Sequence, residues 1–212
     1  MEWSRIKADL FRQQKQENEK RARLLVDFAS LCDTFYGEMN TFVHEAVAEG
    51  LGGFDAGCGT HSSEMRLAEY TLCHRPYRFV ALMEAHGVLE DVERNPRAES
   101  YPSVARILIY PGTGGFDSIP CLAVHFALGQ DNPRADIYAF RGNKAELQVP
   151  GRQGSTSQIG ATVAHEVLQL LFDMPQVWVD RPKYCTLKSN EHIRGMLGFD
   201  TKHSGSLADI ED

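Results

Sequence analysis

The sequence predicts an α+β fold, in which a long N-terminal helix and a second helix cover one face of an antiparallel sheet. An almost uninterrupted helical pattern without proline runs from Glu2 to about Glu49. Short β-rich segments separated by turns follow it, and a second helical pattern comes after them. The loops between the β-rich segments are too short for parallel crossovers. We therefore expect a meander of four to six antiparallel strands with one face buried.

The first helical pattern has two unlike halves. Residues 24–47 carry apolar side chains spaced three and four residues apart, the period that keeps them on one face of a helix: Leu25, Phe28, Cys32, Phe35, Met39, Phe42 and Ala46. Residues 1–23 are charged and rich in glutamine, and their apolar patch consists only of Trp3, Ile6 and Leu10. A helix of this length would span roughly 70 Å, longer than a domain of this size is wide. We expect residues 1–23 to project, either into solvent or against a partner.

The strands are expected between Glu64 and Val149. The segment Arg78–Ala85 also fits one face of a helix, since short apolar runs are ambiguous by period alone. The other segments are rich in β-branched residues or alternate in polarity. The expected strands are Glu64–Cys73, Arg78–Ala85, Val104–Tyr110, Cys121–Leu128, Ala135–Phe140 and Ala145–Val149.

The second helix is expected over Gln158–Phe172. A serine or threonine among residues 155–157 can cap its start, and Pro175 closes it. Its apolar positions fall on one face: Ile159, Val163, Val167, Leu170 and Met174. We expect one α+β domain over residues 24–180, followed by a polar segment, residues 181–212, that is partly disordered.

Composition indicates a cytoplasmic protein. No apolar run approaches the roughly 20 residues that span a bilayer, and the N-terminus lacks the apolar segment of a secretory signal. The five cysteines are scattered and odd in number, which is typical of reduced thiols. The net charge of −7 argues against nucleic-acid binding.

The basic run Lys20–Arg23 lies within the projecting part of the helix. Glu17 precedes Arg21 by four residues, and Glu19 precedes Arg23 by the same interval. Such pairs neutralise each other along a helix. This pattern favours a solvated surface over an RNA-binding one.

His165 and Glu166 are the first candidate catalytic residues. They match the first two positions of the zincin pattern His-Glu-x-x-His, in which two histidines bind zinc and the glutamate activates a water molecule. Gln169 occupies the position of the second histidine and is a poor zinc ligand. The favoured interpretation is a polar flank beside the buried face of a helix, so a metal-dependent hydrolase is the alternative function.

Cys58, His61, Cys73 and His74 are the second candidate set. Thiolate and imidazole are the ligands that zinc prefers, and the spacing from Cys58 to His61 suits one ion. Cys73 and His74 are adjacent, however, so both could bind one ion only if the chain turns between them. Unrelated thiols and imidazoles are the simpler interpretation.

His125 is expected between Ala123 and Ala127 on the small-residue face of a strand. These small neighbours could form the floor of a ligand pocket, or they could let the long helix approach the sheet closely. We favour the second interpretation.

No complete catalytic set emerges, and a long helix with a polar extension is a feature that isolated enzymes seldom need. We therefore predict a non-catalytic adaptor or assembly protein that binds a protein partner or a second copy of itself. No membrane contact and no cofactor are expected. The alternatives are the hydrolase at His165 and Glu166 and a ligand-binding module around His125.

Overall fold

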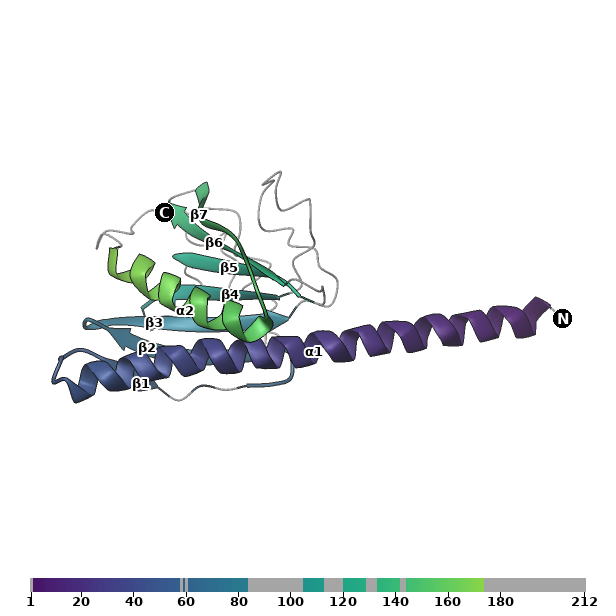
Figure 1. Ribbon diagram of the computed structural model, residues 1–212, viewed down its shortest axis with the longest axis horizontal. Helices are drawn as coiled ribbons and strands as arrows, with labels where there is room; N and C mark the ends of the chain where they lie inside the picture. The colour runs from purple at the N-terminus through teal and green to yellow at the C-terminus, as the bar shows by residue number, and fades with distance from the viewer. Residues whose placement is uncertain are drawn as a thin grey trace, which may run out of the picture.

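The computed structural model describes residues 2–57, 59, 61–83, 105–112, 120–128, 133–141 and 144–173. Over these residues the predicted α+β fold is confirmed, with two helices on one face of an antiparallel sheet (Figure 1). The strands lie side by side in chain order, from β1 to β7. Six of these seven strands agree with the predicted number of four to six, and the three-residue β1 is an additional edge strand. The predicted segment 181–212 lies outside the described residues.

The strands agree with the predicted segments to within a few residues. The segment that also fitted a helix is the strand β3, so the helical interpretation of it was wrong. The bounds are β1 Asp55–Gly57, β2 Met65–Leu72, β3 Arg75–Met83, β4 Ala105–Pro111, β5 Leu122–Ala127, β6 Arg134–Arg141 and β7 Lys144–Gln153.

Helix α1 runs without a break from Glu2 to Ala48, a length of 47 residues. It ends in a Schellman motif, in which Gly50 adopts a left-handed conformation with φ of 80°. The Gly50 N–H donates to the Val47 carbonyl at 3.0 Å, and the Leu51 N–H donates to the Ala46 carbonyl at 3.0 Å. The glycine therefore stops the helix and turns the chain back toward the sheet.

Helix α2, Thr156–Asp173, begins with a reciprocal capping box. The Gln158 N–H donates to Ser155 Oγ at 3.3 Å, and the Ser155 N–H donates to Gln158 Oε1 at 3.1 Å. The helix then packs along α1, and Gly160 sits at the closest approach. A Cβ at Gly160 would lie 2.9 Å from the Leu31 carbonyl oxygen, so only glycine fits there without a shift.

The core between the helices and the sheet contains the predicted apolar stripe of α1. Phe28, Cys32, Phe35 and Met39 are essentially inaccessible to solvent. They join buried residues of α2, such as Val163, and inward-facing residues of the central strands in one cluster. The prediction that both helices cover the same face is confirmed.

The second face of the sheet is also buried, so the expectation of a single buried face was wrong. Its cluster contains Met65, Val80, Leu82, Leu108, Tyr110 and Ala123. Strands β4 and β5 carry apolar residues at consecutive positions, as strands buried on both faces do. The small-residue face of β5 lies here, away from the helices, so the favoured explanation for Ala123 beside His125 was wrong.

Candidate functional site

The N-terminal half of α1, residues 2–23, is the most exposed part of the described chain. Every residue from Trp3 to Arg23 is exposed, and Leu24 is the first buried one. This half continues beyond the sheet to the N-terminus (Figure 1) and is about 33 Å long at 1.5 Å per residue. This half lacks the tertiary packing that supplies most of the stability of helices in proteins. It therefore depends on the packed half for its order and offers its whole circumference to a partner.

Four large apolar side chains of this half are exposed. Trp3 is 76% exposed, Phe11 72%, Leu10 58% and Ile6 45%. At about 100° per residue, Trp3, Ile6 and Leu10 fall on the same side of α1 as the buried stripe that begins at Leu24. The apolar side of the helix thus resumes where the sheet no longer covers it, which is typical of an interaction surface.

The two halves of α1 carry opposite charge. Residues 2–23 contain seven lysines and arginines and four acidic residues, whereas residues 24–49 contain five acidic residues and no lysine or arginine. Pairwise interpretation of the basic run as self-neutralising missed this division. Counting charge separately over the two halves would have found it.

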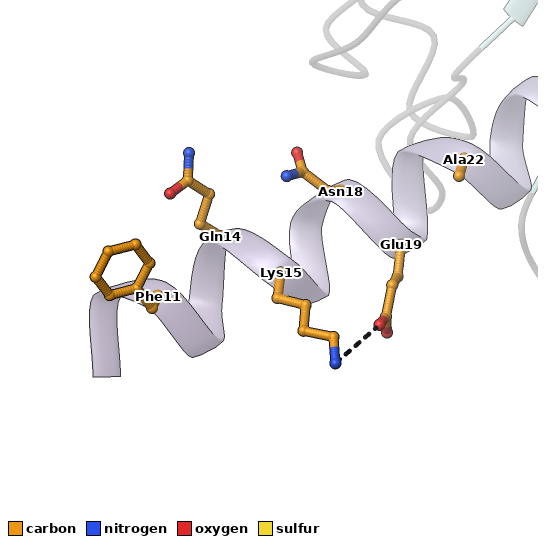
Figure 2. Close-up of a pocket in the computed structure, with 6 residues that line it drawn as sticks. All are labelled: Phe11, Gln14, Lys15, Asn18, Glu19 and Ala22. Atoms are coloured by element: carbon orange, nitrogen blue, oxygen red, sulfur yellow. Dashed lines mark ion pairs between the residues drawn. The ribbon is translucent and has the colours of Figure 1, made fainter. Parts of the chain in front are cut away.

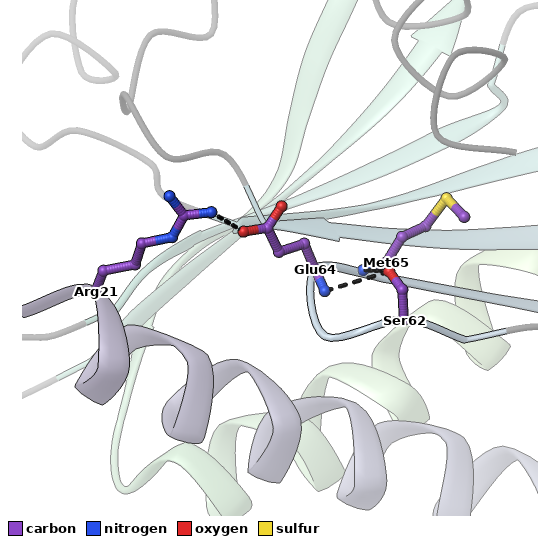
Figure 3. A network of polar contacts seen from close by, with 4 residues as sticks. All are labelled: Arg21, Ser62, Glu64 and Met65. Atoms are coloured by element: carbon purple, nitrogen blue, oxygen red, sulfur yellow. Dashed lines mark hydrogen bonds and ion pairs between the residues drawn. The ribbon is translucent and has the colours of Figure 1, made fainter. Parts of the chain in front are cut away.

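The ion pairs expected within the projecting half are not the ones that form. Arg21 pairs with Glu64, at the start of β2, instead of with Glu17, as Figure 3 shows. Glu19 lies 3.9 Å from Lys15 and not beside Arg23. Ser62 holds the Glu64 end of this contact, because its Oγ accepts hydrogen bonds from the N–H groups of Glu64 and Met65. The Arg21 contact marks the place where α1 leaves the sheet.

A hollow of about 480 Å³ lies along the projecting half (Figure 2). All of its described lining residues come from α1: Phe11, Gln14, Lys15, Asn18, Glu19 and Ala22. These side chains combine one aromatic ring with amides and an ion pair, which fits a docking surface better than a catalytic centre.

His165 and Glu166 lie on α2, as the zincin pattern requires, but His165 faces α1. Its Nε2 atom is 3.2 Å from Glu38 Oε2, and both side chains are partly exposed. Within the described residues, no group of three histidine, cysteine or acidic side chains is arranged to hold a metal ion. The observed role of His165 is to join the two helices.

The three described residues of the proposed zinc set are not brought together. His61 pairs with Arg66 at the beginning of β2, whereas Cys73 and His74 form the turn at its other end, about 20 Å away at 3.3 Å per residue. Cys58 lies outside the described residues. Cys73 and His74 both have positive φ, 51° and 65°, as a two-residue type I′ hairpin turn requires. The turn therefore lies between β2 and β3 and includes Cys73, which was expected to end a strand.

His125 belongs to a buried polar row on the second face of the sheet. Its neighbours across the strands are Arg106 on β4 and Asp136 on β6, and all three are at most 5% exposed. The Tyr138 ring lies 4.9 Å from the imidazole. Burial, together with the Arg106 cation, lowers the pKa of His125 to about 3. A neutral imidazole of such low basicity is a poor proton acceptor at neutral pH. The opposite charges of Arg106 and Asp136, on either side of it, reduce the free-energy cost of burying this row.

Neither described helix has a stretch long and apolar enough to cross a bilayer. No protein family model, no curated protein and no solved structure matches this chain.

Proposed function

We propose that this protein is a non-catalytic interaction or assembly protein that binds its partner through residues 2–23 of α1. The observation that carries this proposal is the complete exposure of that half, including Trp3 and Phe11, on an otherwise well-packed domain. Large exposed aromatic side chains are the usual anchors of protein interfaces. The projecting helix holds them away from the body, where a partner can reach them.

The energetics also support a role in binding. An exposed apolar side chain contributes nothing to the folding of its own domain, yet burying one at an interface stabilises the complex by about 1.5–3 kcal/mol. Residues 2–23 contribute no buried apolar residue to the core. Their aromatic and aliphatic side chains are therefore available for a complex.

The proposal is tested by deleting residues 2–23 and by the variant Trp3→Ala/Ile6→Ala/Leu10→Ala. Native mass spectrometry of protein taken from its own host cell should show an assembly that both changes abolish. The matched control Ser4→Ala/Gln13→Ala/Gln16→Ala alters three exposed polar residues of the same half and should keep the assembly. A monomer in light scattering, with no change in host assemblies upon deletion, would contradict the proposal.

A reducing compartment such as the cytoplasm fits the described thiols, Cys32, Cys73 and Cys121, which are all free. Burial raises the pKa values of Cys32 and Cys121 to about 12, so both stay protonated and unreactive. The hydrolase alternative at His165 and Glu166 stays a prediction. It requires tightly bound zinc that is lost in His165→Ala, whereas the contact with Glu38 predicts only a small loss of stability.

A further inference from the structure

We infer that the side of α1 opposite Trp3, Ile6 and Leu10 packs antiparallel against the α1 helix of a second copy of this chain. This inference rests on the proposed function, that residues 2–23 form a contact, and names a partner for that contact. The opposite charges of the two halves provide the first argument. In an antiparallel pair, the basic half of each helix lies along the acidic half of the other, and the complementary contact occurs twice around one two-fold axis.

Charge selects this arrangement over the other ways of pairing α1. A parallel pair in register would place basic half beside basic half and acidic half beside acidic half, which repels. The antiparallel pair also aligns the two helix dipoles favourably. Because the halves are of nearly equal length, the acidic half of one copy ends where the basic half of the other begins.

The outer side of the acidic half is open to another helix. Val26 is 68% exposed, and a Cβ added at Gly37 would meet nothing within 4 Å. At about 100° per residue, Val26, Gly37, His44 and Ala48 all fall on this outer side, and His44 and Ala48 are exposed as well. Apart from His44 these side chains are short, so a second helix can come close to this side.

The charged residues come level with one another when the two-fold axis passes near residues 25 and 26. Arg5 of one copy is then level with Glu45 of the other, and Arg23 is level with Asp27. None of these four forms an ion pair with the described part of its own chain. Trp3, Ile6 and Leu10 fall on the opposite side of α1 and stay exposed in this pair.

Charge reversal tests the pairing. Arg5→Glu/Arg23→Glu and Asp27→Lys/Glu45→Lys should each weaken the dimer about tenfold or more in analytical ultracentrifugation, because four attractive pairs become repulsive. An equimolar mixture of the two variants should restore the wild-type affinity, since every pair is then opposite in sign again. The control Asp9→Lys/Glu17→Lys reverses charges in the basic half without weakening the dimer.

Cross-linking tests the direction of the helices. With the exposed Cys73 replaced by Ser, Val26→Cys should form a disulfide-linked dimer under mild oxidation, because Val26 lies near the axis. Val47→Cys alone should not, since its two copies lie more than 60 Å apart at 1.5 Å per residue. Gly37→Cys should cross-link when mixed with Arg12→Cys, because both positions face the outer side of α1 and come nearly level.

The outcomes separate this inference from the proposed function. A monomeric wild type, or a mixture of reversal variants that stays dissociated, overturns the antiparallel dimer. If deletion of residues 2–23 still abolishes a host assembly in that case, the proposed function stands with a different partner. A dimer that persists without residues 2–23 overturns both.

Discussion

The two halves of α1 belong to one continuous helix, yet different interactions keep them helical. Residues 24–48 bury Phe28, Phe35 and Met39 against the sheet and α2, whereas residues 3–23 bury nothing. The packed half would be stabilised by burial even with poor helix formers. The projecting half depends on helix propensity and on its junction with the packed half. The comparison teaches that a continuous helix can combine a structural half with a half reserved for contact.

Removing one aromatic ring from each half should give the largest difference. Phe35 is fully buried, and its ring contacts Tyr36 and Phe79. We expect Phe35→Ala to lower the free energy of unfolding by about 3–5 kcal/mol, and Phe11→Ala to change it by less than about 0.5 kcal/mol. Urea denaturation, at a protein concentration where the chain is monomeric, measures both. Equal losses in the two variants would show that the halves do not differ in this way.

A methyl group added to each of two helical glycines should have opposite effects. At Gly160 it would press against the Leu31 carbonyl of the packed half, so we expect Gly160→Ala to cost about 1–3 kcal/mol. At Gly37 nothing lies within 4 Å, and Gly37→Ala should stabilise the protein by about 0.5–1 kcal/mol through helix propensity. Thermal unfolding measured by circular dichroism reports the sign. A stabilising Gly160→Ala would disprove the close helix crossing.

The loss of folding stability at acidic pH should come from His125 in the sheet and not from either half of α1. The folded pKa of His125 is about 3 and its ordinary value is 6.5. Between these values the unfolded chain takes up a proton that the folded chain excludes. Stability should therefore fall as the pH decreases below 6.5, by up to about 1.4 kcal/mol per pH unit.

His125→Gln should remove this part of the slope, and deletion of residues 2–23 should leave it unchanged. Denaturation curves measured from pH 7 to pH 4.5 compare the three proteins. If the Gln variant kept the wild-type slope, the histidine would be protonated in the folded protein.

The smallest effect is expected at the contacts that attach α1 to β2. Asp33 pairs with Arg66, and one of the two side chains is largely exposed. A double-mutant cycle with Asp33→Asn and Arg66→Gln should give a coupling of about 0.2–1 kcal/mol. The same cycle on Lys15 and Glu19 should give about 0.5 kcal/mol or less. A larger coupling in the projecting pair would mean that this half is more ordered than its exposure implies.

The sequence predicts those elements whose signals are local. The apolar period of residues 24–47 and the Ser155 capping box are complete within their own segments, so α1 and α2 are predicted nearly to the residue. The turn at Cys73 and His74 carries no glycine or asparagine, and its position is therefore not readable. The run Ile107–Tyr110 is apolar at every position. The alternation of polarity therefore does not show which of its side chains face the helices.

Site predictions fail where contacts join distant segments. Arg21 chooses Glu64 over Glu17 because the fold brings β2 beside α1, and no spacing rule contains that information. His165 meets Glu38 for the same reason. The charge division of α1, by contrast, is a property of the sequence that was readable from the beginning.

The chain order of this fold has a consequence for its synthesis. Helix α1 leaves the ribosome before any strand it covers, and α2, which packs beside it, follows more than 100 residues later. At 5–20 residues per second, the side chains of Phe28, Phe35 and Met39 wait about 5–25 s for their partners. Since each strand of the meander pairs with the one made just before it, the sheet can grow against this waiting helix. A nascent-chain chaperone, or the helix of a neighbouring nascent chain on the same message, would find its binding site there first.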